Sequence, residues 1–305
     1  MARIALKVDV DTLRGTREGV PRLLQLLARR GLHATFLFSL GPDHTGWALK
    51  RVFRPGFLSK VSRTSVTKHY GWRTLMYGVL LPAPDIGLAG AEVMSATRRA
   101  GHECGIHTWD HVVWQDHVRQ RDAAWTQAEM GKSHDRYIDL FGEVAPTHGA
   151  AGWQMNAAAF EQIDAWGMAY ASDGRGDAPY RLHVNGRTLK HVQMPTTLPT
   201  LDELIGQRGI AEDNVARTLL AQTALAPDRD QVYTLHAELE GGLLAPAFEA
   251  LLDGWAAQGH ELVTMAGLYR HINRDTLPVR PLTWGSVDGR SGELIVEGAA
   301  RRPRT

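Results

Sequence analysis

The sequence contains a single cysteine, Cys104, among its 305 residues. One thiol excludes an internal disulfide framework and a metal site built only from thiolates. It suits a reducing compartment, although a secreted protein can also carry one cysteine. The sequence also has no run of about 18 apolar residues, and the apolar stretch in residues 1–11 is too short for a signal-peptide core. We therefore expect neither a transmembrane helix nor export.

Net charge is also nearly absent, because 34 Lys and Arg residues face 33 Asp and Glu residues, which gives a formal charge of +1. Such a chain has no global field that attracts nucleic acid, so we expect no nucleic-acid partner. Any electrostatic function must come from a local cluster of charge.

Apolar segments typical of buried strands alternate with segments of helical periodicity along most of the chain. We expect strands at residues 4–10, 33–40, 103–107, 169–172, 192–194, 231–235 and 261–264, and helices at 18–30, 90–100, 120–141, 155–166, 212–222 and 246–258. This alternation predicts an α/β fold with a largely parallel sheet, either open or closed into a barrel. We expect one domain over residues 1–273, with an insertion at 43–85 after the second strand. The Gly- and Arg-rich residues 274–305 are expected to form a hairpin and a disordered basic end.

Two carboxylates, Asp9 and Asp11, lie at the end of the first expected strand. Side chains two residues apart in an extended chain leave it on the same side. A turn or a helix cap explains most isolated D-x-D pairs, so this pair alone does not identify a site.

Two histidines, His107 and His111, are four residues apart in the stretch GIHTWDH. On a helix or tight turn this spacing directs both imidazoles to one point, as zinc-type sites require. The stretch is not the zincin motif, since Thr108 follows the first histidine and no glutamate intervenes. An ordinary pair of surface or packing histidines is about equally compatible with the spacing.

Two further residues also follow expected strands: Asp173 in ASDGRG and His236 in TLHAELEGG. His236 could act as an acid or base near neutral pH, or could be a core histidine bonded to a carbonyl. The carboxyl ends of parallel barrel strands share one face, so all these side chains could converge there. Two histidines and a carboxylate can hold a metal, which leaves another carboxylate and a histidine for hydrolysis by an activated water.

In order and spacing, these stretches resemble the motifs of the polysaccharide deacetylase (NodB-homology) family. The first motif corresponds to Val8-Asp9-Val10-Asp11-Thr12, the second to His107-Thr108-Trp109-Asp110-His111, and the last to Thr234-Leu235-His236. The resemblance implies a distorted (β/α) barrel with one divalent metal ion bound by Asp11, His107 and His111. It also implies that Asp9 is the catalytic base and His236 the catalytic acid. These ligands suit zinc, cobalt, manganese or nickel.

Within this family, several stretches are similar to a group of deformylases that act on a formamido sugar carried by undecaprenyl phosphate. They are VDVDTLRGTREGVPRLL, FSLGPDHTG, GIHTWDHVVWQ, AAGWQ, SDGRG, QMPTTLPTLDELIG and TLHAELEGG. This similarity implies release of formate, a function in the aminoarabinose modification of lipid A and in polymyxin resistance, and a place on the cytoplasmic face of the bacterial inner membrane. Thr108 and Trp153 are then expected to contact the substrate. A secreted polysaccharide or peptidoglycan deacetylase and a non-catalytic membrane-surface metal-binding protein are the alternatives.

One departure from the family concerns its third motif, R-x-P-x-G, whose arginine orients the catalytic aspartate. Residues 145–149 read APTHG and contain no arginine. Arg175 is our candidate for the substitute, with Asp173 holding His236 or Asp9. A solvated loop arginine is about as consistent with the sequence.

The insertion has no acidic residue between His44 and Pro84. Its seven Lys and Arg residues alternate with aromatic and aliphatic side chains that suit a membrane interface with anionic lipids: Trp47, Phe53, Phe57, Tyr70, Trp72 and Leu80. Each basic residue near such a surface contributes about 1 kcal/mol. A helical hairpin packed on the barrel, with its basic residues merely solvated, is the alternative, and single-stranded nucleic acid also suits such a pattern.

Overall fold

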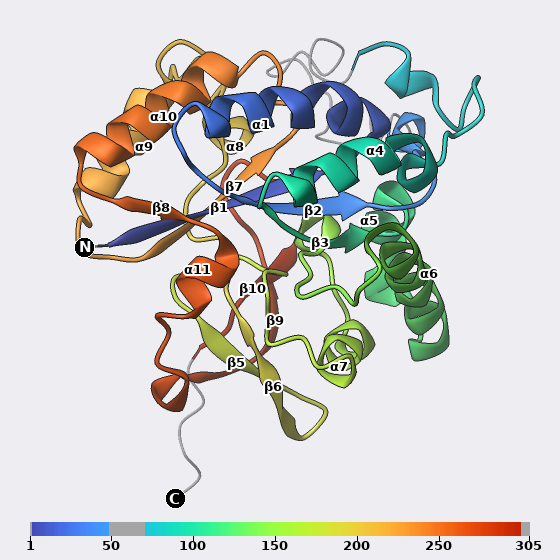
Figure 1. Ribbon diagram of the computed structural model, residues 1–305. Coiled ribbons are helices and arrows are strands. Elements are labelled where there is room, and N and C mark those ends of the chain that lie inside the picture. The colour runs from blue at the N-terminus through green and yellow to red at the C-terminus, as the bar shows by residue number, and fades with distance from the viewer. Residues whose placement is uncertain (1, 49–70, 300–305) are drawn as a thin grey trace, which may run out of the picture.

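The computed structural model describes residues 2–48 and 71–299, and its strands and helices alternate along most of the chain, except at 170–193 and 279–297, where strands follow one another directly (Figure 1). The strands are β1 Arg3–Val10, β2 Thr35–Ser39, β3 Glu103–Thr108, β4 Tyr170–Ala171, β5 Tyr180–Val184, β6 Arg187–Gln193, β7 Gln231–His236, β8 Glu261–Val263, β9 Val279–Gly285 and β10 Leu294–Glu297. The α-helices are α1 Val20–Ala28, α4 Ile86–Arg99, α5 His111–His117, α6 Ala123–Phe141, α7 Ala157–Ala165, α8 Leu201–Leu204, α9 Val215–Ala224, α10 Ala245–Ala257 and α11 Met265–Tyr269. The π-helix η1 spans Gly15–Gly19, and the 3-10 helices are η3 Thr74–Met76, η4 Val118–Gln120, η5 Ala151–Trp153 and η6 Arg274–Thr276.

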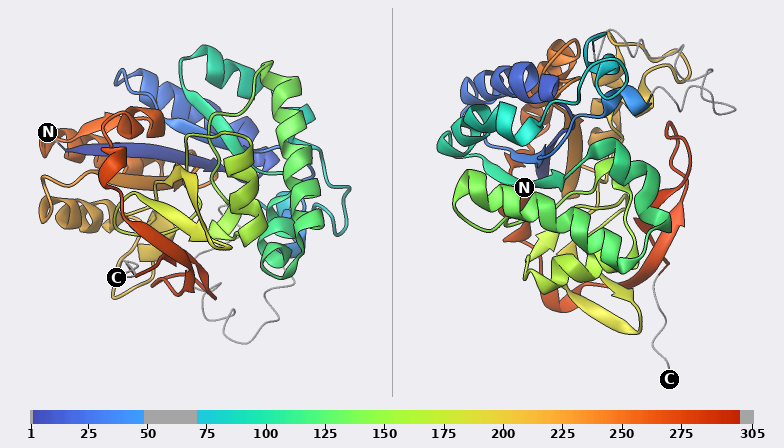
Figure 2. Two further views of the ribbon diagram at one scale, coloured as in Figure 1. Left: turned by 90° about the horizontal axis from the view of Figure 1, so that it is seen from below. Right: turned by 90° about the vertical axis from the view of Figure 1, so that its right-hand side faces the viewer.

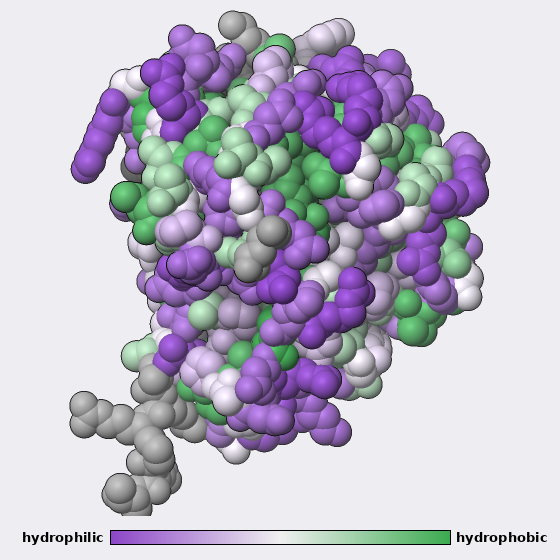
Figure 3. Space-filling view, turned by 60° about the vertical axis from the view of Figure 1, so that its left-hand side comes forward, coloured by the Kyte–Doolittle hydropathy of each residue, from purple (hydrophilic) through white to green (hydrophobic). Residues whose placement is uncertain are grey.

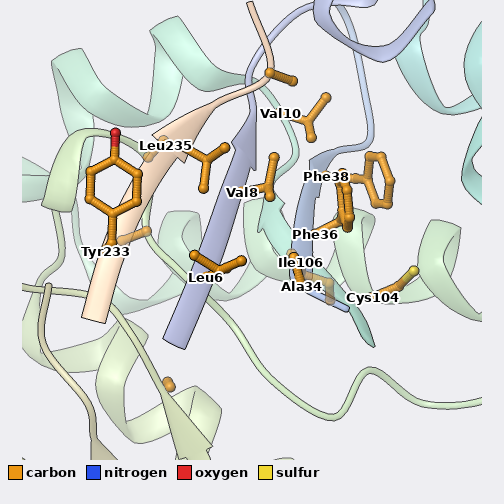
Figure 4. Packing of buried hydrophobic residues seen from close by; sticks show 14 of the residues in the cluster. Leu6, Val8, Val10, Ala34, Phe36, Phe38, Cys104, Ile106, Tyr233 and Leu235 are labelled. Carbon is orange, nitrogen blue, oxygen red and sulfur yellow. The ribbon is translucent and has the colours of Figure 1, made fainter. Parts of the chain in front are cut away.

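The first sheet is parallel, in the order β3-β2-β1-β7, and β8 also pairs with β1. Side chains alternate across it, and Leu6, Val8 and Val10 of β1 point toward the layer of helices that includes α1 and α4 (Figures 1 and 4). These side chains are fully buried and pack with Phe36, Phe38 and other residues of the main hydrophobic core. The other face of β1 carries Lys7 and Asp9, so one strand contributes to both the core and the barrel interior.

The second sheet has the order β10-β9-β5-β6-β4 and lies across the first sheet from α1 and α4 (Figures 1 and 2). Short main-chain contacts join the two sheets. At one edge, Ile106 of β3 and His148 form a bridge, and the amide of Ser172, after β4, donates to the His148 carbonyl. At the other, the amides of Thr197 and Leu198 donate to the carbonyl of Val232 in β7. These contacts complete a distorted (β/α) barrel, the fold class that the resemblance implies.

The second sheet contains pairings that the sequence did not predict. We expected only residues 192–194 as a strand, but β6 is longer and pairs antiparallel with β5. Both strands carry several polar or charged residues, so the apolar pattern that marks a buried strand is weak there. The hairpin expected in the tail is present as β9–β10, and β9 also pairs parallel with β5. The tail therefore contributes two strands to the second sheet.

The insertion begins and ends at a two-stranded contact, where Pro42 and Asp85 form an antiparallel bridge and the amide of Asp43 donates to the carbonyl of Pro84. Phe53, Phe57 and Tyr70, expected at a membrane interface, lie outside the described residues.

Across residues 2–48 and 71–299, no helix has the length and apolar character that a membrane span needs. Hydrophilic residues predominate on the face drawn in Figure 3, with hydrophobic ones in small groups between them.

Candidate active site

Three potential metal ligands meet at the carboxyl end of the first sheet. Asp11 follows β1, His107 lies in β3, and His111 is the first residue of α5. One ligand atom from each lies within 4.8 Å of the others. The Nε2 atom of His107 is 3.1 Å from Oδ1 of Asp11, and Nε2 of His111 is 3.5 Å from Oδ2. The two histidines therefore approach from a strand end and a helix start, not from adjacent turns of one helix.

The local structure fixes how each histidine points. Nδ1 of His107 is 2.6 Å from the carbonyl oxygen of Gly149, so Nδ1 carries the proton and Nε2 faces Asp11 with its lone pair. Asp110 caps α5 by accepting the amide of Val113 at 3.0 Å, and its other carboxylate oxygen bonds to His44. The turn that presents His111 is thus held from two sides.

The facing atoms of this cluster fit a metal ion better than they fit each other. Asp11 Oδ1 and His107 Nε2 are buried, and neither has a hydrogen-bond partner among the described residues, although they are 3.1 Å apart. Buried polar atoms normally have partners, and an imidazole nitrogen and a carboxylate oxygen are both common ligands of divalent cations. The donor set of one carboxylate and two imidazoles therefore fits one divalent metal ion with open positions.

Neighbouring charges shift the pKa values of the Asp11 and His107 side chains. Burial would raise the pKa of the Asp11 carboxyl, but the neighbouring His111 and His107 hold it well below its usual range. Burial would likewise lower the pKa of His107, but the carboxylates of Asp9 and Asp11 outweigh burial and raise it. The cluster thus favours an ionised Asp11, which is the form that binds a cation.

Asp9 lies beside the cluster on the inner face of β1. Its Oδ1 atom is 4.0 Å from Nδ1 of His107, is buried, and has no hydrogen bond within the described part of the chain. Its Oδ2 atom is 3.2 Å from Nζ of Lys7, whose side chain is fully buried. One oxygen is therefore paired, and the other is free to accept a proton.

His236 is the last residue of β7 and pairs in register with Asp9 of β1. Its side chain is 9% exposed, and its buried Nδ1 has no hydrogen bond among the described residues. Its backbone amide donates to Glu240 at 2.9 Å, and burial raises the pKa of Glu240 to about 7. Because His236 and Asp9 are paired on adjacent strands, their side chains project from the same face of the sheet, into the barrel interior.

A buried glutamate, Glu238, supports the loop that carries Asp11. Its Oε1 atom accepts the amides of Asp11 at 3.1 Å and Thr12 at 2.8 Å, and the Thr12 hydroxyl at 2.7 Å. Burial, followed by the charge of Asp11, raises the pKa of Glu238 to about 8. A side chain at Gly15 would come 1.9 Å from Oε1 of Glu238, so it would displace this carboxylate from the hydrogen bonds that hold the loop.

Two of the expected site residues have other partners. Asp173 bonds to Nδ1 of His148 at 2.6 Å and to Nε2 of Gln193 at 2.9 Å. Arg175 bonds to the carboxylate of Glu203 and to the carbonyls of Thr196 and Leu198 at 3.3 and 3.1 Å. These contacts correct the expectation that Asp173 and Arg175 hold Asp9 or His236. Both side chains are buried within the barrel, where polar groups must find the nearest partner.

The two expected substrate contacts, Thr108 and Trp153, are also buried. The hydroxyl of Thr108 has no hydrogen bond among the described residues. The Trp153 ring donates from Nε1 to the Thr196 hydroxyl at 3.2 Å. Its faces are flanked by Arg290 at 4.8 Å, Arg175 at 5.0 Å and Lys7 at 5.6 Å from the ring centre. Contact of either residue with substrate stays a prediction.

Sequence reasoning missed Lys7, His148 and Glu238. A signal existed for Lys7, because a lysine two residues before Asp9 in an otherwise apolar strand must share the face of Asp9. Glu238 lies two residues after His236 in a stretch already noted. His148 occupies the third motif, but only the folded chain shows that it contacts Asp173.

Comparison with solved structures identifies the fold. A protein from Mycobacterium smegmatis that is named as a polysaccharide deacetylase is similar, with a TM-score of 0.63 and 18% identity over 94% of this chain and 95% of the other. An allantoinase is similar with a TM-score of 0.58 and 18% identity, over 88% and 90% of the two chains. No protein-family model matches the chain. The barrel is therefore of the polysaccharide deacetylase type.

Sequence relatives narrow this class. A protein from Shewanella sediminis named 4-deoxy-4-formamido-L-arabinose-phosphoundecaprenol deformylase, ArnD, is 36% identical over 96% of this chain and 94% of its own. A protein of the same name from Wigglesworthia glossinidia brevipalpis is 30% identical, over 93% and 98% of the two chains. The chain belongs to the ArnD deformylase family. It is a hydrolase that acts on an amide C–N bond, in a deformylase or deacetylase type of reaction.

Proposed function

We propose that the protein hydrolyses the formamide of 4-deoxy-4-formamido-L-arabinose carried on undecaprenyl phosphate, releasing formate and the free amine. The observation that carries the proposal is the meeting of Asp11, His107 and His111, within 4.8 Å of one another, beside the unpaired Oδ1 of Asp9. The names of the two relatives supply the substrate. The reaction would serve the aminoarabinose modification of lipid A and polymyxin resistance.

In this proposal Asp11, His107 and His111 hold one divalent metal ion. An ion held by these residues would supply Lewis acidity, which lowers the pKa of a water molecule and polarises a carbonyl oxygen. Zinc, cobalt, manganese and nickel all suit the ligands. Gly149 fixes the tautomer of His107 through its carbonyl, and Glu238 fixes the loop that carries Asp11.

Asp9 is the general base, because its Oδ1 is buried and unpaired among the described residues and lies next to the ligand cluster. It removes a proton from the attacking water. His236 is the general acid, and it protonates the sugar nitrogen as the C–N bond breaks. Without that proton the leaving group would be an amide anion, which is far too basic to leave.

We also propose that the protein binds the cytoplasmic face of the inner membrane, where a lipid-linked substrate would be presented. Two apolar side chains at the end of the insertion are exposed to solvent, Trp72 by 71% and Leu80 by 75%. Arg73 lies beside Trp72, and this pairing suits an interface with anionic lipids. Trp47 is part-buried instead, where it stacks on His44 and donates to the carbonyl of Gly78.

The deciding experiment measures formate release from the formamido-arabinose lipid phosphate, with and without a chelator. Chelator-sensitive formate release supports the proposal. Acetate release from an acetylated glycan, without formate from the lipid, would instead identify a polysaccharide deacetylase. Metal binding without turnover of either substrate would favour a non-catalytic metal-binding protein.

A further inference from the structure

We infer that Lys7 is the positioning residue for Asp9, and that it holds one carboxylate oxygen so that the other faces the cluster of Asp11, His107 and His111. This inference deepens the proposed function and rests on it for the catalytic consequence. Its structural part concerns the carboxylate itself and can be tested separately.

The first argument is burial. The side chain of Lys7 is fully buried, and its Nζ atom has no hydrogen-bond partner among the described residues. Removal of an ammonium group from water is strongly unfavourable unless an opposite charge compensates it. The ion pair found for it is with Oδ2 of Asp9, at 3.2 Å. The pairing therefore explains why a lysine is tolerated at this place in the barrel.

The second argument is that the backbone determines this pairing. Lys7 and Asp9 are two residues apart on β1, so both side chains project from its inner face. In the parallel register Lys7 pairs with Thr234 and Asp9 pairs with His236 of β7. Lys7 is thus the residue before Asp9 on the inner face of β1, and the alternation of side chains along the strand places the two next to each other.

The third argument is that the lysine has little room to move. A side chain at Gly149 would come 2.9 Å from Cε and 3.3 Å from Nζ of Lys7, so the backbone lies directly against it. The Trp153 ring lies on another side, 5.6 Å from Nζ. The carbonyl oxygen of the same Gly149 accepts a hydrogen bond from Nδ1 of His107. One stretch of main chain therefore confines Lys7 and orients a metal ligand.

The fourth argument is that the two oxygens of Asp9 have different surroundings. Oδ2 faces Lys7, whereas Oδ1 lies 4.0 Å from the His107 ring and lacks a hydrogen bond in the described structure. A partial rotation of the carboxylate would carry Oδ2 away from Nζ and break the ion pair, whereas a half turn would only exchange two equivalent oxygens. Lys7 therefore selects the orientation in which Oδ1 can accept a proton. Arg175, the alternative from the sequence, is paired with Glu203 instead.

The structural test compares crystal structures of the wild type and Lys7→Met, a variant of similar length without the charge. We expect the Asp9 carboxylate to rotate or to occupy two conformers, while Asp11, His107 and His111 stay in place. An unmoved Asp9 carboxylate would overturn the inference, whether or not the wild type releases formate. Formate release by the wild type is the separate test of the proposed function.

The kinetic test is a double-mutant cycle with Asp9→Asn. We expect Lys7→Met to lower kcat by about 100-fold, the effect of a small misplacement of a catalytic group, with KM and metal content nearly unchanged. In the Asp9→Asn background the same change should have no further effect on kcat, because Lys7 acts through Asp9. Equal losses in both backgrounds would contradict the inference.

Folding is the remaining concern, since Lys7→Met alone leaves Asp9 buried without its counter-charge. The double variant Lys7→Met/Asp9→Asn removes both charges and avoids this effect. Comparison of its kcat with that of Asp9→Asn alone then answers the question: equal values support the inference, and a further drop overturns it. A thermal unfolding curve for each variant confirms that folded protein is compared.

Discussion

The backbone amide of Asp11 donates a hydrogen bond to Oε1 of Glu238, which joins the first potential metal ligand to a residue 227 positions later. The same oxygen accepts two hydrogen bonds from Thr12, so one carboxyl oxygen fixes the whole turn after β1. The orientation of Asp11 is thus fixed by a residue in the turn after β7.

Replacement of Glu238 by alanine should weaken metal binding and folding together. Three buried donors would lose their acceptor, and each such loss costs about 1–3 kcal/mol. Loss of a residue that orients a ligand typically lowers metal affinity about 10- to 100-fold. Glu238→Gln keeps an oxygen in the same place and should be much less affected. Competition with a chelating dye measures the affinity, and equal losses in both variants would contradict this role.

Replacement of Asp9 by asparagine should separate catalysis from metal binding. Asp9→Asn removes the proposed base but none of the ligands, so formate release should fall by about 100-fold or more while bound metal is retained. His107→Ala removes a ligand and should lose both. Elemental analysis beside the activity assay distinguishes the two results. Substantial activity in Asp9→Asn would show that another group is the base.

Replacement of His236 by alanine should lower kcat by about 10²–10⁴-fold, the usual contribution of an acid or base. The loss should shrink for a formate ester of the same sugar, because an alkoxide needs protonation less than an amide anion does. His271→Ala, which changes an exposed histidine, is the control. A loss of the same size on amide and ester would argue against protonation of the nitrogen.

His102 should make stability depend on pH. Burial, with a contribution from nearby His33, lowers its pKa from 6.5 to about 4, and its Nδ1 accepts the amide of Ala34 at 3.1 Å. As the pH falls from 6.5 toward 4, the unfolded chain binds a proton that the folded chain does not, so the unfolding free energy should decrease by up to about 3 kcal/mol.

Urea unfolding at several pH values measures this decrease. His102→Gln retains an acceptor and should flatten the dependence between pH 6.5 and pH 4. The exposed control His271→Gln should leave the dependence unchanged. An equally steep decrease in His102→Gln would assign it to other groups.

Loss of the exposed apolar side chains near the end of the insertion should weaken membrane binding. Trp72→Ser/Leu80→Ser removes two side chains that are 71% and 75% exposed. We expect the affinity for vesicles with anionic lipid to fall by about tenfold or more. Leu225→Ser is a matched control, since Leu225 is 88% exposed on another element. Sedimentation with vesicles gives the measurement, and equal binding by both variants would contradict the proposed surface.

The sequence predicted the strands β1, β3 and β7 that position the cluster because their local patterns are strong, but it did not predict helix α5, which begins at His111. Residues 4–10 are apolar except for the charges that line the site, and three of the five residues at 231–235 (QVYTL) are β-branched or aromatic, as is typical of strands. The strand β5 escaped prediction because it is not buried throughout and depends on distant partners, and the hairpin in the tail was expected without the pairing of β9 to β5. Local periodicity therefore identified the first sheet and missed much of the second.

The cluster itself could be anticipated because strand ends converge in a parallel barrel. The partners of Asp173 and Arg175 could not be anticipated, because several buried carboxylates and histidines lie close together and each could pair with them. Lys7 could have been assigned from alternation alone, whereas Glu238 required knowledge of how the turn after β7 packs against the turn after β1.

The carbonyl of Gly149 orients His107, and it belongs to the main chain. Substitution of a side chain cannot delete this acceptor, so the imidazole orientation should tolerate drift in the surrounding sequence. Displacement of the backbone is a different matter, because Gly149 lies against Lys7 and Leu37. Even a methyl group at this position would push the chain outward, and the ligand and the base would shift together.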